Sequence, residues 1–493
     1  MPLSFLAALA IAVAPVVLVQ SLPIQDYPNH LARMHILLNH DASAALERFY
    51  EIHWAPLPNL ALDLIVPELG RAMPLDWAGR AFIAMGFALT AGGAVLLHAA
   101  LFQRLALWPL LAFLFLYDRL LLLGVLNYLF GLGLALVGFA AWLALHQRPA
   151  LPRIVVSSLF ATVVYLAHLF AFAIYGLLVL GYELGQLVRR REDGASRATR
   201  ALAIAAAQAV VPLVLFFSAP HAGGEIFFGN QLRKLYLLFS VFDDYSRPFD
   251  IASFVLVFGA YLVAWRQGLL RIAPAMVGPL LALAVAYLLA PNMVMTAASV
   301  DRRLPIAFVL VLIAATRPTE HASERLRLFA FIAAALLFVG RMTVVMQNWR
   351  QSDRLYAQVL PAFDTIPAGS RIAVAYPPSA VNLRTGATPI LHVPTYAVIA
   401  RDAFVPSLFA MRTQQPVRFA AGYEELAAAA SPRQLWETLV LGAPAPPLLA
   451  SALEQFDFVC LVDHDPFVLA QTAGLEPVWE RPSFKLYRLA KPR

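Results

Sequence analysis

The chain has 493 residues, of which 60% are hydrophobic and only 14% are charged. A soluble domain carries about 25% charged residues, so this composition excludes a purely soluble fold and indicates a polytopic membrane protein with some soluble mass attached. The formal net charge of +7 does not point to nucleic acid, because the basic residues lie mostly in short loops between apolar runs, where membrane topology explains them.

Apolar runs long enough to cross a bilayer, about 20 residues each, recur up to residue 346 and then stop. We predict an α-helical transmembrane domain over 1–346 with about eleven spans. They are placed at 3–21, 80–101, 105–118, 122–145, 153–168, 170–188, 201–219, 251–265, 272–290, 304–316 and 328–346. The first run has no basic n-region and no clear cleavage site, so we expect a retained helix.

The loops between these spans alternate in charge. Basic residues gather in one set, at 103–104, 146–153, 189–200, 266–271 and 317–327, whereas the longer loops of the other set hold few. The positive-inside rule places the basic set in the cytoplasm. We therefore expect a multi-pass protein of a bacterial inner membrane, with a cytoplasmic N-terminus and with the first loop and the C-terminal part outside.

The first outward loop, 22–79, is too long to be a simple connector. Residues 28–48 have helical periodicity, and Asp26, His30 and Arg33 are spaced i, i+4, i+7. A helix starting here places all three on one face. An acid, an imidazole and a guanidinium at a membrane surface indicate chemistry on a lipid-borne substrate.

For Asp26 two interpretations stay open. Its carboxylate can act as a general base, or it can cap the helix whose first turn holds Pro28. His30 is the candidate that supports the acid in catalysis, with a plain surface role as its alternative. Asn29 and Arg33 are the candidates on this loop for binding substrate, and Arg33 could grip a phosphate or a headgroup.

Other polar side chains lie at the outer ends of spans. Because guanidinium groups form forked hydrogen bonds with phosphate oxygens, we expect a phosphate site among Arg119, Arg233, Lys234, Asp301, Arg302 and Arg303. The alternative is that these side chains snorkel to lipid headgroups. Asn127 and His168 are candidates for a substrate cavity, with hydrogen bonding between helices as their alternative.

The remaining loops and the tail have their own patterns. Residues 59–75 predict an interfacial helix broken near a proline, and 220–250 mixes aromatic and charged residues that suit the headgroup layer. Beyond residue 346 the sequence predicts a small extracytoplasmic α/β domain over 347–493. Its strands are expected at 371–376 and 456–462, followed by a hairpin at 478–489.

No metal or other cofactor is expected. Asp243-Asp244 could supply metal ligands, but adjacent acids in a solvated loop are more often inert. Asp463-His464-Asp465 follows a predicted strand directly, where a polar turn is expected, and two acids with one histidine do not define a metal site. The single cysteine excludes a cysteine cluster.

A first span, a long outward loop with an acid at its start, many further spans and an outward tail together resemble the GT-C glycosyltransferases. That resemblance implies transfer of a sugar from a polyprenyl-phosphate carrier to a lipid or glycan acceptor. Asp26 stands where those enzymes place a catalytic or metal-binding acid. Many members carry paired acids in this loop, whereas Asp26 is flanked by Gln25 and Tyr27, which argues against a divalent metal.

Two other functions remain open at this point. A transporter or lipid flippase would carry acids and bases near the middle of its spans, or paired broken helices, whereas the polar residues here lie at the outer ends. A non-catalytic protein of envelope assembly fits the large outward loops equally well.

Overall fold

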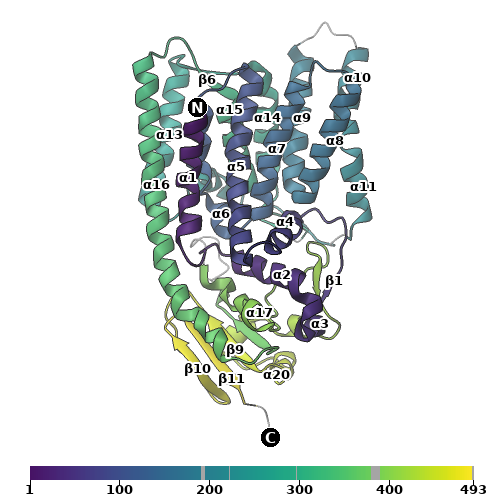
Figure 1. Ribbon diagram of the computed structural model, residues 1–493, viewed down its shortest axis with the longest axis vertical. Coiled ribbons are helices and arrows are strands. Elements are labelled where there is room, and N and C mark those ends of the chain that lie inside the picture. The colour runs from purple at the N-terminus through teal and green to yellow at the C-terminus, as the bar shows by residue number, and fades with distance from the viewer. Residues whose placement is uncertain (190–194, 221–222, 296, 379–388, 491–493) are drawn as a thin grey trace.

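The computed structural model describes residues 1–189, 195–220, 223–295, 297–378 and 389–490, and it is mostly helical (Figure 1). Most of the molecule is a bundle of long helices. A smaller part that contains a sheet lies beyond one end of this bundle and is built from about the last third of the chain. The helices of the bundle are α1 (Pro2–Leu18), α5 (Leu75–Phe102), α7 (Leu126–Ala144), α8 (Ala150–Ala167), α9 (Leu169–Arg189), α10 (Ala195–Ala207), α11 (Val210–Ser218), α13 (Arg247–Arg266), α14 (Val277–Leu289), α15 (Arg303–Ala315) and α16 (Glu324–Val359).

Within the described residues, six helices are long and apolar enough to cross a membrane, and a seventh span arises if α10 and α11 count as one. The chain is thus a multi-pass membrane protein, although fewer helices reach spanning length than the eleven predicted. Helices α1, α14 and α15 are apolar but shorter. Helices α10 and α11 meet at 44°, because Pro212 has no N–H for the carbonyl of Gln208.

The predicted span at 105–118 is not an α-helix. Its centre is a 3-10 helix, η2 (Trp108–Phe115), with Pro109 in its first turn. Most residues of η2 are buried, and η2 contacts α1, α5, α15 and α16. Hydrophobicity alone does not separate such a buried core segment from a lipid-facing span.

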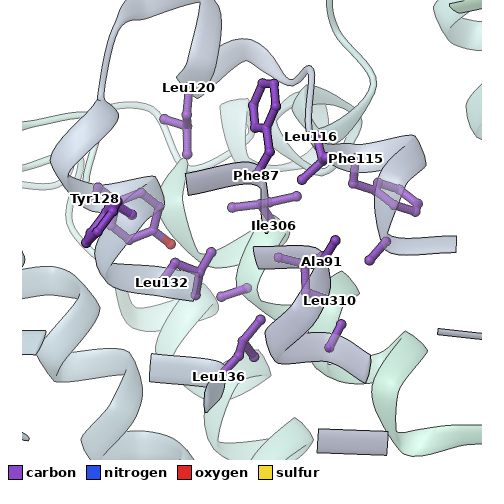
Figure 2. Packing of buried hydrophobic residues seen from close by; sticks show 14 of the residues in the cluster. Phe87, Ala91, Phe115, Leu116, Leu120, Tyr128, Leu132, Leu136, Ile306 and Leu310 are labelled. Carbon is purple, nitrogen blue, oxygen red and sulfur yellow. The ribbon is translucent and has the colours of Figure 1, made fainter. Parts of the chain in front are cut away.

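The core of the bundle lies where α5, α7 and α15 meet. Figure 2 shows Phe87 and Ala91 of α5 facing Leu132 and Leu136 of α7, with Ile306 and further side chains of α15 and η2 beside them. Glycines let α5 and α7 approach closely. A Cβ on Gly93 would lie 2.8 Å from the Cβ of Leu136, and one on Gly133 would lie 2.8 Å from that of Leu89. Membrane helices gain little from the hydrophobic effect when they associate, because lipid is as apolar as their side chains. Small residues at such a crossing permit the close van der Waals packing that stabilises it.

The first loop and the C-terminal part share a second apolar core. The loop contains α2 (Tyr27–Asn39), η1 (His40–Ala42), α3 (Ala44–Phe49), β1 (Tyr50–Ile52) and α4 (Ala61–Gly70). Strand β1 pairs antiparallel with β8 (Val417–Phe419), and the hydroxyl of Tyr50 donates to the carbonyl of Ala403 over 2.9 Å. The first loop is therefore built into the C-terminal part (Figure 1).

The C-terminal part contains a four-stranded sheet in the order β10-β11-β9-β7. Strand β7 (Ile372–Ala375) runs parallel to β9 (Phe458–Val462), and β11 (Phe484–Leu489) pairs antiparallel with β9 and with β10 (Leu475–Arg481). Both β7 and β9 are fully buried, as their continuous apolar runs predict. The helices of this part are α17 (Tyr396–Arg401), α18 (Tyr423–Ala429), α19 (Pro432–Leu439) and α20 (Pro447–Leu453).

Between α11 and α15 the chain forms short elements at both ends of the bundle. They are β2 (Ile226–Phe227), α12 (Arg233–Leu237), η3 (Leu238–Val241), β3 (Leu270–Ile272), η4 (Pro274–Met276), β4 (Met293–Val294) and β5 (Ala297–Ala298). Strand β6 (Thr316–Pro318) follows α15 and pairs with β3. Helix α16 then continues without a break past residue 346, where the sequence predicts the end of the membrane domain.

A buried arginine ties α16 to α13 and to the segment that precedes it. The guanidinium of Arg341 donates to Asp250 over 3.0 Å, to Asp244 over 2.6 Å and to the carbonyl of Phe242 over 3.1 Å. The side chains of Arg341, Asp244 and Asp250 are all inaccessible to solvent. This cluster therefore positions residues 242–250 against the bundle.

We expect Arg341→Met to lower stability by about 3–5 kcal/mol, because breaking a buried ion pair leaves uncompensated carboxylates. The melting temperature in detergent measures this. The matched control is Arg341→Met combined with Asp244→Asn and Asp250→Asn, which removes the orphaned charges and should recover part of the loss. Equal melting temperatures for wild type and Arg341→Met would contradict the assignment.

Candidate active site

The residues that the sequence predicts as a site all lie at one end of the bundle, the end that faces the C-terminal part (Figure 1). Helix α2 follows α1 there, α7 begins there, α8 passes into α9 there, and α15 starts there. The five-residue helix α6 (Arg119–Leu123) lies at the same end. Antiparallel connection of the helices thus gathers side chains that are far apart in the sequence.

Asp26 immediately precedes α2, but its side chain makes no capping hydrogen bond. The capping role is therefore not what the structure shows. Instead, its Oδ1 lies 3.3 Å from Nε2 of His392 in η7 (Pro389–Thr395), and the Asp26 side chain remains 23% exposed. This carboxylate is held from one side and reachable from another, as a general base requires.

Helix α6 supports Asp26 from behind. The amides of Gln25 and Asp26 donate to the carbonyls of Leu122 and Leu123 over 3.0 and 3.2 Å. Gly124 ends the helix with φ +91°, and a Cβ there would lie 2.7 Å from the Cβ of Asp26. A glycine is required at position 124 both for its left-handed backbone and for this approach.

His30 lies near Asp26 and bonds to other groups. Its Nε2 bonds the carbonyl of Gly124 over 3.0 Å, so Nε2 is the donor and Nδ1 accepts from Arg33 over 3.4 Å. Burial, followed by the charge of Arg33, lowers the pKa of His30 to about 4. The ring is therefore neutral at pH 7, which suits an orienting role.

Arg33 is fully buried and forms a forked ion pair with Asp63 of α4, at 2.6 and 3.1 Å. This pairing commits the guanidinium to holding α2 against α4, whereas the sequence predicts a grip on phosphate. Asp63 was missed at the sequence level. Its signal is a lone acid in the apolar stretch 60–67, where an unpaired carboxylate would be costly.

Asn29 joins α2 to the C-terminal part. Its Oδ1 accepts from the amide of Phe409 over 2.6 Å, while its Nδ2 donates to the carbonyl of Ser407 over 2.8 Å and lies 3.3 Å from Nδ1 of His392. The Phe409 ring packs edge-on against His30 and His392, with centroids 5.8 and 5.1 Å apart. His392 has no local sequence signal, because its neighbours on the chain are apolar.

Three of the predicted phosphate residues, Arg119, Arg233 and Arg302, lie close enough for their charges to interact, and Arg119 begins α6. Arg119 donates to Asp243 over 3.0 and 2.8 Å, and Tyr236 donates to the same carboxylate over 3.1 Å. Arg302 is 3% exposed, and its Nε and Nη1 are buried without a hydrogen-bond partner. Burial and the nearby charges of Arg119 and Arg233 lower the pKa of Arg302 to about 10. This guanidinium is still charged at pH 7.

The other cations of this group each make at least one polar contact, although Nε of Arg303 is also buried without a hydrogen-bond partner. Lys234 donates to the carbonyl of Leu288 over 2.6 Å, and Arg303 donates to that of Ala298 over 3.0 Å. Arg303 also lies over the ring of Phe170, 4.9 Å from its centroid. Arg233 lies 3.6 Å from the carboxylate of Asp301 at the rim of the cluster.

Asn127 and His168 serve the fold. The Asn127 amide accepts from the N–H of Leu62 over 2.8 Å and donates to the carbonyl of Asn59 over 2.7 Å, which anchors the start of α4. Nδ1 of His168 accepts from the amide of Phe170 at the junction of α8 and α9. Asn127 thus makes structural hydrogen bonds to a distant segment, whereas the His168 bond is local to the junction of two helices.

Neither acidic motif gathers ligands for a metal. Asp243 pairs with Arg119, whereas Asp244 points to Arg341. The Asp463 carboxylate accepts from the amide of His464, as in a turn. In the parts of the chain that the structure describes, no group of three or more His, Cys, Asp or Glu side chains is arranged to hold a metal ion.

Helix α6 connects the two halves of the site. The buried Asp118 caps its start by accepting from the amide of Leu121 over 2.9 Å, and Arg119 follows. Gly124 at its end touches Asp26 and His30. Five residues at about 1.5 Å each separate the ends by roughly 7 Å. Asp26 therefore lies beside one end of this short helix, and Arg119 lies at the other end.

We expect the stability of the protein to fall on acidification from pH 7 to pH 5. The unfolded chain takes up a proton on His30 near pH 6.5, whereas the folded pKa is about 4, so the folded state loses about 2 kcal/mol at pH 5. His30→Gln keeps a donor for Gly124 and should flatten this dependence. Melting temperatures at pH 5, 6 and 7 test it, and identical pH slopes for the two proteins would contradict it.

Comparison with known proteins finds likeness in structure only. No family model matches the chain, and no curated protein matches it. ArnT from Cupriavidus metallidurans bound to undecaprenyl phosphate has a TM-score of 0.54 at 12% identity, and its apo state 0.53 at 13%. Each covers 100% of this chain and 99% of ArnT. The arabinofuranosyltransferase AftD from Mycobacteria has a TM-score of 0.54 at 14% identity over 100% of this chain and 40% of AftD. The whole chain therefore has the GT-C fold that its sequence resemblance implies.

Proposed function

We propose that this protein is a glycosyltransferase that moves a sugar from a polyprenyl-phosphate donor to a lipid or glycan acceptor. The reaction would take place at the outer face of a bacterial inner membrane, with the N-terminus in the cytoplasm. One observation carries the proposal. Helix α6 lies against a reachable carboxylate, Asp26, at one end and, at the other, near Arg302, a buried guanidinium with two nitrogens that have no hydrogen-bond partner.

The two groups match the two demands of glycosyl transfer. The acceptor hydroxyl oxygen forms a bond to the anomeric carbon and gives its proton to Asp26. The bond between that carbon and the phosphate oxygen breaks, and the polyprenyl phosphate leaves with the electron pair. Arg302 stabilises the negative charge on this leaving group, and Arg119 and Arg233 add to the positive field around it.

The surroundings support this assignment. Arg119 is already neutralised in part by Asp243, whereas two buried nitrogens of Arg302 would be satisfied by phosphate oxygens. A buried donor without a partner costs about 1–3 kcal/mol, so an anion that fills this position is bound favourably. The fold is shared with ArnT, which has been seen with undecaprenyl phosphate bound. The residues named here need no metal ion in these roles.

We expect Arg302→Gln to lose carrier binding while Asp26→Asn keeps it. Native mass spectrometry of the protein in nanodiscs with added undecaprenyl phosphate measures the bound fraction. Arg71→Gln is the matched control, because Arg71 forms an exposed ion pair with Glu68 near the same end of the bundle. Equal retention by the Arg302 and Arg71 variants would contradict the phosphate site, and no retention in any form would contradict a carrier-dependent transferase.

We expect Asp26→Asn to lower transfer by about 10²- to 10⁴-fold, the usual contribution of a general base. The assay follows release of undecaprenyl phosphate from synthetic undecaprenyl-phosphate hexoses and pentoses, with bacterial envelope lipid and glycan as acceptors. Asp41→Asn is the control, since Asp41 is an almost fully exposed acid of the same loop. Wild-type turnover by Asp26→Asn would remove Asp26 from the mechanism.

A further inference from the structure

We infer that His392 is a positioning residue for Asp26 and that Asn29 determines which ring nitrogen of His392 carries the proton. The inference rests on the proposed role of Asp26 as the base. It adds a residue from the C-terminal part, 363 positions along the chain from Asn29, to a site otherwise built from the first loop and the bundle.

The orientation of the Asn29 amide follows from its partners. Its oxygen accepts from the backbone N–H of Phe409, and its nitrogen donates to the backbone carbonyl of Ser407. Both backbone partners have fixed roles, so the amide cannot be turned over without facing donor to donor and acceptor to acceptor. The amide nitrogen, 3.3 Å from Nδ1 of His392, therefore presents N–H to that ring.

The tautomer of His392 follows in turn. A ring nitrogen that faces an N–H donor must accept, so Nδ1 carries no proton and the proton of the neutral ring lies on Nε2. Nε2 lies 3.3 Å from Oδ1 of Asp26. Contacts of this length in an unliganded site commonly shorten when substrate binds. The ring thus presents N–H to one carboxylate oxygen, and the other oxygen takes the proton of the acceptor.

The titratable and charged groups of α2 and α4 near Asp26 and His392 are bonded to other residues. On α2, His30 uses Nε2 on the carbonyl of Gly124 and is neutral at pH 7. Arg33 is paired with Asp63 of α4. His392 is 9% exposed on its side chain, compared with 23% for Asp26. The imidazole is therefore enclosed while the carboxylate reaches the solvent side.

The chain contains a matched arrangement that serves only docking. Nδ2 of Asn39 lies 3.2 Å from Nδ1 of His35, whose Nε2 lies 2.8 Å from Oδ1 of Asp402. The second oxygen of Asp402 accepts from Ser43 over 2.8 Å. Both sets join α2 to the C-terminal part, but both oxygens of Asp402 are occupied. Variants of His35 and Asn39 therefore measure the cost of a loosened interface alone.

The first test reads the tautomer without any enzymatic assay. In ¹⁵N spectra of histidine-labelled protein, the signal lost in His392→Gln should be that of a neutral ring protonated on Nε2. Asn29→Asp places an acceptor on Nδ1 and should shift this signal to a ring protonated there, whereas Asn39→Asp should leave it unchanged. A wild-type His392 protonated on Nδ1 would overturn the inference.

The second test separates positioning from docking. We expect His392→Leu to lower kcat for release of undecaprenyl phosphate by about 10- to 100-fold, the effect of one hydrogen bond to a charged group. KM for the donor should be unchanged, and His392→Gln, whose amide can donate to Asp26, should recover part of the loss. His35→Leu is the control and should keep kcat near the wild-type value.

The two proposals fail in different ways. Equal kcat for His392→Leu and His35→Leu, with Asp26→Asn inactive, would overturn the positioning role and leave the transferase intact. Full activity in Asp26→Asn would overturn the base, and the ¹⁵N spectra would still decide the tautomer. Melting temperatures and bound undecaprenyl phosphate, measured on the same samples, exclude misfolding as the cause of a loss.

Discussion

Gly124 lies so close to Asp26 that any side chain at this position would overlap the Cβ of the acid. This approach places α6 directly behind the carboxylate, and its two backbone hydrogen bonds to residues 25 and 26 hold it there. The same glycine carbonyl orients His30. Arg119 lies at the other end of α6, so the same short helix also fixes where this arginine stands relative to Asp26. With any other residue at position 124, α6 could not lie this close to Asp26.

Several buried arginines of this protein are paired with carboxylates. Desolvating an ion costs several kcal/mol, which a well-placed counter-ion offsets. The described residues follow this rule in Arg33 with Asp63, Arg119 with Asp243, Arg153 with Glu183, and Arg341 with Asp244 and Asp250. Arg302 and Arg303 have no such carboxylate partner among those residues, and Arg302 has two buried nitrogens without a hydrogen-bond partner, compared with one for Arg303. Arg302 therefore has the most unused donors of the buried arginines, which is why the proposed phosphate site is placed there.

Part of this site could be predicted from the sequence. Local spacing predicts a helix after Asp26 with His30 and Arg33 on one face, and α2 has this form. What the face contacts depends on pairing between distant segments: Asp63 lies 30 residues from Arg33, and no local pattern joins them. His392 is further still and lies among apolar neighbours. Adjacent acids also look alike in a sequence, whereas Asp243 and Asp244 bind different arginines.

The span prediction fails for a different physical reason. Hydrophobicity reports that a segment avoids water but not whether lipid or protein surrounds it, so the buried η2 segment resembles a membrane helix. A change in composition also does not show whether a helix ends there or continues. Helix α16 stays regular from the far end of the bundle into the C-terminal part, although the residues around 346 change from apolar to polar.

The contact between Asn29 and His392 joins positions 363 residues apart, and this separation has a consequence for synthesis. A ribosome adds about 5–20 residues per second, so roughly 20–70 s pass between the appearance of the first loop and that of its imidazole partner. During this interval α2 lacks the segment that encloses it. A nascent chain that has not reached residue 392 would carry the acid without this imidazole, so the proposed site is complete only once that residue has been synthesised.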